Sequence, residues 1–355
     1  MNIHQIMRAL IVGTFMLLSI NPVSAQTGED DFAVNFTDNI TNRGTSAASF
    51  LEIGIGAKAQ AIGGAFTALA NDATALYWNP AGIASLESIS ITANHAAWLA
   101  DTKLNYFGIV LPFSRGMAVG LILNVLDYVD KQPVRTILQP EGTGEDYGAA
   151  DLTLGMSYGI QLTNRFAFAV SGKYIQQKIW NETAKTFALD FGVLYHTRLK
   201  GMSIGASITN FGGDMKLEGR DLVRAFDEDP QNFSNDKLNV SLKTDAFPLP
   251  ILFRFGLAYA LELNSQNKLT TAVDVIHPSN NIESMNLGLE YSFMNLFALR
   301  AGYQSLFDQS RENGLTLGFG IEASTKSSMG VGFNYAYSSW GLLDKVQRFS
   351  IDLSL

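Results

Sequence analysis

From Ser88 to the C-terminus, large apolar residues recur at every second position over segments of about 8 to 13 residues. In one such segment, Phe253, Phe255 and Leu257 alternate with Arg254 and Gly256. A period of two is that of a strand with two different faces. Strands of soluble proteins average about 5 to 6 residues, whereas a strand that crosses a bilayer needs about 9 to 11. The alternation therefore favours long strands that present a bulky apolar face to lipid.

Fourteen such segments can be counted, and the connections after the third and seventh are much longer than those after even-numbered segments. Outer-membrane barrels have an even strand number, short periplasmic turns and longer outer loops. We therefore predict an all-β fold, a 14-stranded antiparallel transmembrane β-barrel in the bacterial outer membrane, with outer-membrane lipid around it. The predicted strands are 88–98, 104–112, 117–128, 149–161, 166–179, 184–197, 202–210, 250–262, 267–277, 284–294, 297–304, 314–323, 328–337 and 346–355.

Aromatic residues collect toward the ends of these segments, which is typical of the two interfaces of a membrane barrel. We expect two girdles. The first, on the side of the long loops, comprises Trp98, Tyr128, Trp180, Tyr303, Tyr337 and Trp340, and the second comprises Tyr158, Tyr195, Tyr259 and Phe293.

Composition narrows the classes of function. The chain has no cysteine, only 16% charged residues and a net charge of −8. Thiol chemistry and disulfides are thereby excluded, and nucleic acid is not expected as a partner because phosphate binding needs a basic face.

The first quarter of the chain lacks the strand period. Residues 1–25 have the apolar core and the Val23-Ser24-Ala25 ending of a cleaved signal peptide. Residues 26–45 are a polar lead-in, and residues 46–87 are rich in Ala and Gly with helix-like spacing at Ile55, Ala59 and Ile62. We predict that 46–87 form a small helical N-terminal plug, or hatch, in the lumen of a barrel made by 88–355.

Within this segment, Gly63-Gly64-Ala65-Phe66, Asn71-Asp72-Ala73 and Tyr77-Trp78-Asn79-Pro80-Ala81-Gly82 resemble the N-terminal signature of the PorV/PorQ family. The stretch also resembles the wider fatty-acid transporter (FadL) superfamily. Both groups are fourteen-stranded outer-membrane barrels in which this segment plugs the lumen. The resemblance implies a plug motif of Gly63, Gly64, Asp72, Asn79, Pro80, Ala81 and Gly82.

The resemblance implies two alternative functions. A PorV-like protein acts in type IX secretion or surface export by binding cargo domains or translocon components, here through the outer loops and the upper rim. A FadL-like protein takes up hydrophobic small molecules. A third alternative is a purely structural envelope protein. The sequence Asn79-Pro80-Ala81-Gly82 is closer to the broad family pattern than to the PorV segment, which ends in lysine.

No pattern for catalysis, a cofactor or a metal stands out. His95, His196 and His277 fall near the ends of different predicted strands without metal-ligand spacing. The Gly54–Ala59 stretch approaches a dinucleotide fingerprint but lacks the βαβ context which that motif requires. We expect no enzymatic activity, no cofactor and no metal site.

Charged residues in the strands occupy the face opposite the bulky apolar rows. Charge on the lipid face costs roughly 2 to 4 kcal/mol at the midplane, so these residues are expected in the lumen. We expect Arg300 to lie between Glu290 and Glu322, and Arg254 to meet Asp274. Pairing with one another and with the plug is one role, and a substrate or gating path is the alternative. The lumen charges are Asp190, Arg254, Asp274, Glu290, Arg300, Glu322 and Asp352.

Overall fold

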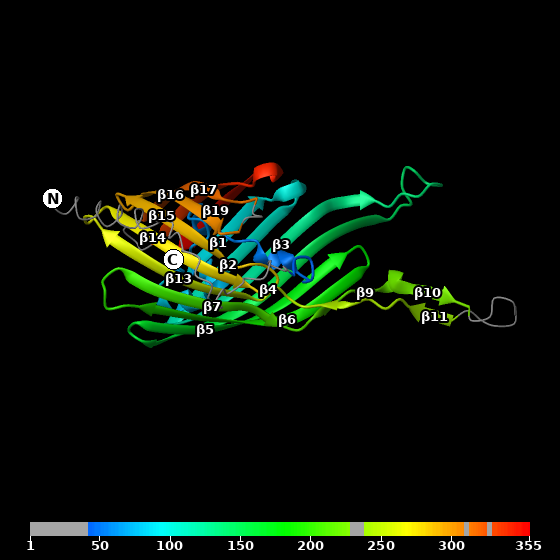
Figure 1. Ribbon diagram of the computed structural model, residues 1–355, viewed down its shortest axis with the longest axis horizontal. Coiled ribbons are helices and arrows are strands. Elements are labelled where there is room, and N and C mark those ends of the chain that lie inside the picture. The colour runs from blue at the N-terminus through cyan, green and yellow to red at the C-terminus, as the bar shows by residue number, and fades with distance from the viewer. Residues whose placement is uncertain (1–41, 228–237, 309–311, 325–328) are drawn as a thin grey trace, which may run out of the picture. The chain divides into compact units, whose positions relative to one another are not determined.

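In a computed structural model of the chain, which describes residues 42–227, 238–308, 312–324 and 329–355, the main sheet closes on itself. The sheet contains fourteen antiparallel ring strands and the short β9, and pairing of β5 with β6 completes the circle (Figure 1). The first and last strands, β1 and β19, lie side by side, with Ser90 opposite Ser354. The predicted fourteen-stranded barrel is therefore confirmed, while the predicted signal peptide and most of the polar lead-in lie outside the described residues.

Every predicted segment corresponds to one ring strand, with shifts of a few residues at the ends. The ring strands are β1 (Ser90–Ala97), β2 (Lys103–Ser114), β3 (Met117–Pro133), β4 (Asp146–Thr163), β5 (Phe166–Ile179), β6 (Glu182–His196), β7 (Met202–Gly212), β13 (Leu252–Glu262), β14 (Lys268–Pro278), β15 (Ser284–Phe293), β16 (Phe297–Leu306), β17 (Leu315–Ser324), β18 (Gly330–Ser339) and β19 (Lys345–Ser354).

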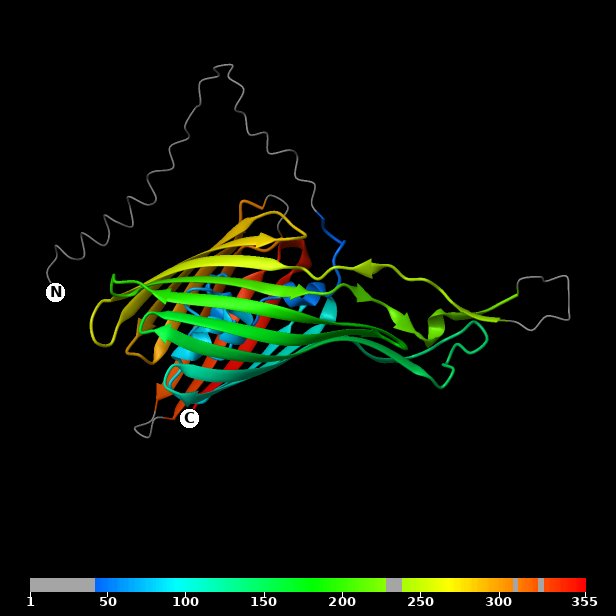
Figure 2. The same ribbon diagram turned by 90° about the horizontal axis from the view of Figure 1, so that it is seen from below.

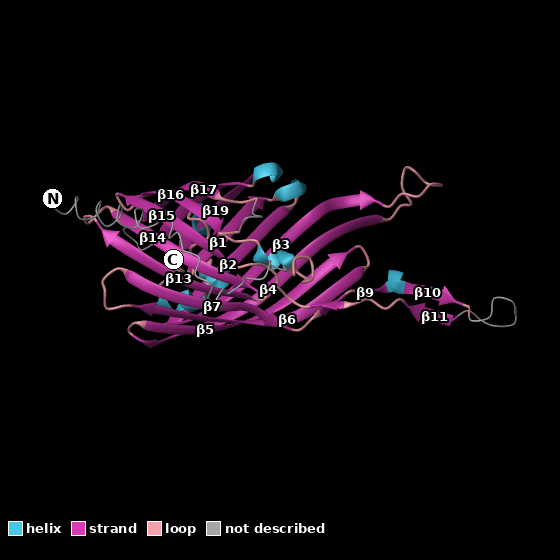
Figure 3. Ribbon diagram, in the orientation of Figure 1, coloured by secondary structure: helices cyan, strands magenta, loops and turns pink. Residues whose placement is uncertain are grey.

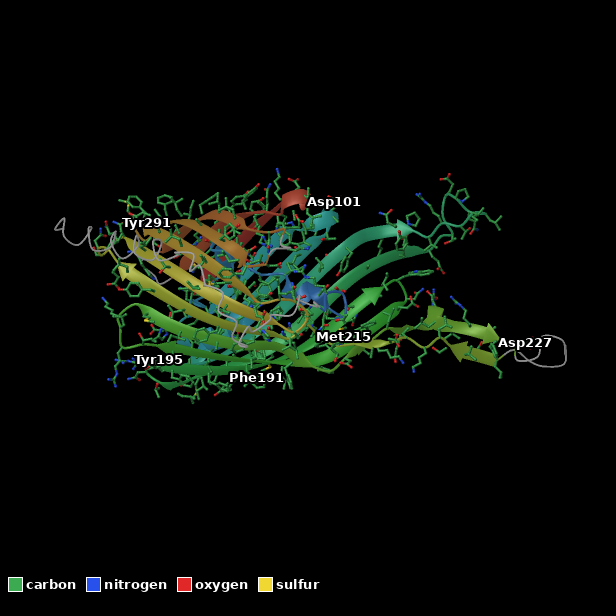
Figure 4. The ribbon with its side chains drawn as sticks, in the orientation of Figure 1. Asp101, Phe191, Tyr195, Met215, Asp227 and Tyr291 are labelled. Atoms are coloured by element: carbon green, nitrogen blue, oxygen red, sulfur yellow. The ribbon has the colours of Figure 1, made fainter. Side chains whose placement is uncertain are left out.

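The two faces of the wall differ as the alternation predicts. Phe253, Phe255 and Leu257 of β13 are exposed on the outside, whereas Arg254 and Ala258 are buried. A bulky apolar outer face suits contact with lipid tails, and a small or polar inner face leaves room for the plug. Tyr195 and Tyr291 lie toward the end of the barrel that carries the short turns, which we call the inner end, and Asp227 lies far from them (Figure 4).

The N-terminal segment lies inside the ring, where its short helices are seen in blue in Figure 2. Its elements are η1 (Ser49–Glu52), α2 (Ala57–Ala61), α3 (Ala75–Trp78) and η2 (Pro80–Ser85). The helix-like spacing begins at Ile55, and the helix found there, α2, ends after Ala61 because Gly63 and Gly64 adopt positive φ angles of 71° and 73°. Among the described residues, no helix is long and apolar enough to cross a bilayer.

Two extensions project from the end of the barrel that carries the long connections, which we call the outer end (Figures 1 and 3). One is formed by the outer ends of β3 and β4. The other is the connection between β7 and β13, which the sequence indicated only as a loop. It contains β8 (Met215–Lys216), β9 (Glu218–Gly219), η4 (Arg220–Leu222), β10 (Val223–Phe226), β11 (Leu238–Ser241) and β12 (Ala246–Phe247), and β10 pairs with β11 as a hairpin. Short 3-10 turns, η3 (Leu99–Asp101) and η5 (Gly341–Leu343), complete the outer rim.

Candidate functional site: the plugged lumen and its outer mouth

The described chain begins at the outer mouth and runs down through the lumen. Arg43 forms an ion pair with Asp308 at 2.9 Å, and the Ala47 N–H donates to Pro248 O at 2.9 Å. Both partners belong to connections at the outer end. At the inner end, Ile89 exchanges backbone hydrogen bonds with Leu355 just before β1 begins. The plug is therefore attached to the wall at both ends of the lumen.

Gly63 brings the backbone of the plug against the backbone of the wall, whereas a Cβ on Gly64 would meet the side chains of Trp78 and Asn286. A Cβ on Gly63 would lie 2.7 Å from Leu287 O and 2.8 Å from Tyr303 N, and a Cβ on Gly302 of β16 would collide with Gly63. Close approach on both sides requires that neither residue carries a side chain. Gly63 of the plug and Gly302 of the wall therefore permit the close approach of the plug to β15–β16.

Asn79-Pro80-Ala81-Gly82 ties the plug to the opposite wall. The fully buried Asn79 amide donates to Thr67 O and to Val193 O of β6, both at 2.9 Å, and its Oδ1 accepts from the Ala81 N–H at 3.2 Å. Pro80 occupies the first turn of η2, where its missing N–H costs nothing. A Cβ on Gly82 would strike Ala70 O, so Gly82 permits the plug to fold back on itself.

Asp274 of β14 is used as an anchor for the plug backbone. Its Oδ2 accepts from the N–H groups of Phe66 and Thr67, at 3.0 Å and 2.9 Å, and the residue is fully buried. Two backbone donors in a turn would otherwise be buried without a partner, which costs about 1 to 3 kcal/mol each. This wall carboxylate therefore supplies an acceptor for two N–H groups of the plug.

The predicted grouping of Arg300 with Glu290 and Glu322 is present. Arg300 Nε lies 2.6 Å from Glu290, and its Nη2 lies 3.7 Å from Glu322. Lys58 of α2 continues the network, 3.4 Å from the motif residue Asp72 and 4.0 Å from Glu322. Burial alone would lower the pKa of Lys58, but the carboxylates around it outweigh that effect and raise it.

Asp72 has a second role, since its Oδ1 accepts from the Thr74 N–H at 2.8 Å immediately before α3. The neighbouring Asn71 accepts from Lys58 at 3.1 Å. Plug and wall are joined here by charges of alternating sign.

The remaining lumen carboxylates also have partners. Asp190 pairs with Lys173 of β5 at 2.8 Å and accepts from the Asn210 N–H at 2.7 Å, where the ladder between β6 and β7 shifts register. Asp352 accepts from Thr92 at 2.5 Å and from Asn334 at 2.7 Å. Sequence reasoning missed Lys173, although its position shares the inward parity of Ser171 and Ala169.

Arg254 does not form the expected ion pair with Asp274. In the register of β13 and β14, Arg254 lies opposite Ile276, and Asp274 lies opposite Gly256. The guanidinium instead stacks on the rings of Tyr77 and Trp78, with Cζ 5.4 Å from each centroid. The Asp274 carboxylate is occupied by plug N–H groups, so this prediction was wrong because it considered the wall without the plug.

Above the plug, the outer mouth contains a cavity of about 440 Å³, which we call the outer cavity. Its lining includes Trp78 from the plug, Trp98, Trp340, Arg254 and Arg348. Trp98 and Trp340 were predicted in the lipid girdle, but they follow the inward parity of β1 and β18 and contact each other edge to face at 5.0 Å. The assignment to the girdle was wrong for these two residues. The parity of their strands indicates the inward position.

Below the outer cavity, the plug occupies the lumen. Residues of η2 contact β2–β6 and residues of α2 contact β16–β19, while Ser203 and Ser207 of β7 donate to the plug carbonyls of Ala68 and Trp78. Two cavities between plug and wall have volumes of about 20 and 10 Å³. Each of these cavities has room for about one water molecule.

Comparison with known structures shows which solved proteins share this fold. The chain is similar to the CymD monoaromatic hydrocarbon channel, with a TM-score of 0.54 and 13% identity over 85% of this chain and 97% of that one. The toluene transporters TodX of Pseudomonas putida and TbuX of Ralstonia pickettii each give a TM-score of 0.51 over the same shares, at 13% and 11% identity. At such identity the likeness shows the fold alone.

Comparison of the sequence with protein families is more specific. No curated protein matches the chain, but the family described as type IX secretion system protein PorV matches residues 36–279. This range contains the whole plug motif and the wall as far as β14. The closed barrel and the family together place the protein in the bacterial outer membrane. The chain belongs to the PorV family of type IX secretion system proteins.

Proposed function

We propose that this barrel acts without catalysis in type IX protein secretion, by binding secreted cargo or a translocon component at its outer end. Family membership supports the pathway, and one structural observation supports the place. Large apolar side chains are exposed on the outer extensions, beyond the ring strands. Ile137 and Leu138, between β3 and β4, are 100% and 91% exposed.

The β10–β11 hairpin adds to this surface. Val223, Phe226, Leu238 and Leu242 are all exposed on it. Exposed apolar residues that gather on a projecting element are typical of a site for protein partners. We call Ile137, Leu138 and these four hairpin residues the outer apolar surface.

The lumen favours export over the alternative of hydrophobic uptake. Uptake requires an apolar path from the mouth past the plug. Here the plug contacts β2–β6 through η2 and β16–β19 through α2. Its anchors include the buried Asn79 amide and the Asp274 carboxylate. Passage through the lumen would require buried hydrogen bonds of this kind to break.

The proposal is tested by replacing Phe226 and Leu238 with serine and measuring how much type IX cargo reaches the cell surface and the medium. Leu199→Ser is the matched control, because Leu199 is equally exposed but lies in an inner turn. We expect the double variant to lower cargo export severalfold and the control to leave it unchanged, with equal amounts of folded barrel in the membrane.

Photo-crosslinking identifies the partner directly. A crosslinking residue at position 226 or 137 should capture cargo or a translocon component, and one at 199 should not. Unchanged export by the Phe226→Ser/Leu238→Ser variant, together with no partner captured from either outer position, would reject the proposal.

A further inference from the structure

The outer cavity contains two buried arginines without a carboxylate partner. Arg254 and Arg348 are 3% exposed, and neither has a carboxylate within 4 Å among the described residues. This differs from Arg300 deeper in the lumen, which contacts two carboxylates. Glu52 and Asp274 interact with Arg254 only at longer range, and a buried cation without a carboxylate in contact is costly, so the environment of the two arginines calls for explanation.

Aromatic rings cover the faces of both guanidiniums. Arg254 stacks on Tyr77 and Trp78, and Arg348 lies over Trp98, with Cζ 5.1 Å from the ring centroid. Stacking compensates the charge through the ring faces but leaves the N–H groups at the guanidinium edge free. The acceptors that the protein supplies to these edges are neutral hydroxyls: Thr209 accepts from Arg254 at 3.3 Å beside the Tyr77 hydroxyl, and Ser338 accepts from Arg348 at 3.2 Å.

Three buried nitrogen donors without a hydrogen-bond partner lie in the outer cavity. In the described part of the chain, the buried side-chain nitrogens that lack a hydrogen-bond partner are Arg254 Nε, Arg348 Nε and Trp340 Nε1. All three residues line the outer cavity. A cavity with three such donors offers hydrogen bonds to a ligand that carries an acceptor.

Carboxylates at the rim do not remove this excess. Asp308 is paired with Arg43, and Glu52 accepts from Asn280 at 3.2 Å. Glu312 lies at the Gly341–Leu342 turn, where its Oε2 is 3.5 Å from the Leu342 nitrogen. These acids line the entrance, while the arginines stand on the walls below it.

The size and lining of the cavity define the ligand. A volume of about 440 Å³ is within the range of small-molecule sites, and the tryptophans provide flat apolar walls. β13 and β19 are six positions apart in the ring of fourteen strands, so the two arginines face the cavity from nearly opposite sides. Guanidinium edges recognise carboxylates with paired hydrogen bonds.

We propose that the outer cavity binds an organic carboxylate, whose apolar body lies against Trp78, Trp98 and Trp340 and whose carboxylate accepts hydrogen bonds from Arg254 or Arg348. The carboxylate belongs either to a free organic acid or to the C-terminus of a polypeptide. This inference does not depend on the outer apolar surface or on its partner.

The test uses the full barrel in uncharged detergent with 4-phenylbutyrate as the probe and 4-phenylbutyramide as its neutral counterpart. Binding is followed by calorimetry and by tryptophan fluorescence, since three of the four tryptophans line the cavity. We expect saturable binding of the acid and at least tenfold weaker binding of the amide. This comparison needs no variant, so it is independent of any effect on folding.

Arg254→Gln and Arg348→Gln are then compared with Arg165→Gln, whose arginine is exposed in an inner turn. We expect at least one cavity variant to lose affinity about tenfold or more, and Arg254→Lys to lose less than Arg254→Gln because it keeps the charge. Arg165→Gln should bind as the wild type does. Equal binding of acid and amide, or full affinity in both cavity variants, would overturn the proposal.

A pair of short peptides distinguishes the two sources of carboxylate. A peptide with a free C-terminus that binds, when its amidated form does not, assigns the site to a chain end. Binding of 4-phenylbutyrate alone assigns it to a free acid. Both results support the carboxylate site, and no binding by either probe refutes it.

Discussion

The wall of the barrel and its plug are built on different principles. In the wall, the strands alternate between an outward and an inward face, so that Leu257 and Phe255 face outward on either side of Gly256. In the plug, the described helices have at most six residues, and individual contacts with the wall replace regular structure. The wall therefore depends on a pattern that tolerates exchange within a residue class, and the plug depends on particular atoms.

The largest effect is expected where plug and wall meet backbone to backbone. Gly302→Val places a side chain in the space of Gly63, and because neither backbone can move away easily we expect loss of the folded barrel or its severe destabilisation. The folded fraction is measured by heat-modifiable electrophoretic mobility, in which unheated and heated samples are compared on a gel. Gly172→Val is the control, since a Cβ there meets nothing within 4 Å, and its folded fraction should stay high.

The lipid face is tested by Leu257→Lys in the middle of β13. A charge near the bilayer midplane should lower the free energy of unfolding by about 2 to 4 kcal/mol. Leu257→Met keeps the side chain apolar and should cost less than about 1.5 kcal/mol. Urea unfolding in lipid vesicles measures both, and equal stability of the two variants would contradict an outward Leu257.

The specificity of the plug is tested by Asn79→Ala. This change leaves Thr67 O and Val193 O without their donor, so we expect a loss of about 2 kcal/mol. Proteolysis of the plug in the intact barrel is the readout that separates plug release from unfolding of the wall. Asn164→Ala in an exposed inner turn should change neither.

The smallest expected effect concerns Glu52 of η1. Burial raises its pKa, while its hydrogen bond from Asn280 and the charge of Arg254 oppose that shift. Because the folded state favours the protonated acid, its contribution to stability is present below the ordinary pKa of 4.5 and is lost as pH rises through the raised value. Glu52→Gln should therefore reduce the fall in melting temperature between pH 4 and pH 7, and an identical fall in both proteins would contradict this.

The wall could be predicted from the sequence because a strand's alternation is local information. Each of the fourteen segments corresponds to a ring strand, and the grouping of Arg300 with Glu290 follows once these strands are paired. The same alternation indicates that Trp98, Trp340 and Lys173 face inward, because each shares the parity of the buried residues in its strand.

The plug contacts could not be predicted in the same way. The choice of Asp274 as acceptor for the Phe66 N–H joins residues about two hundred positions apart, and nothing in either segment specifies the other. A residue pairing across strands also depends on register, and a shift of two residues placed Arg254 opposite Ile276. The resemblance identified which plug residues matter, and the structure supplied the partners that explain why.

The attachment of the plug at both ends constrains the order of assembly. Arg43 is fixed at the outer mouth and Ile89 at the inner end, and the seam between the first and last strands closes the ring beside the exit of the chain. We therefore expect this segment to pack against the inner face of the open sheet before β1 and β19 pair and close the ring.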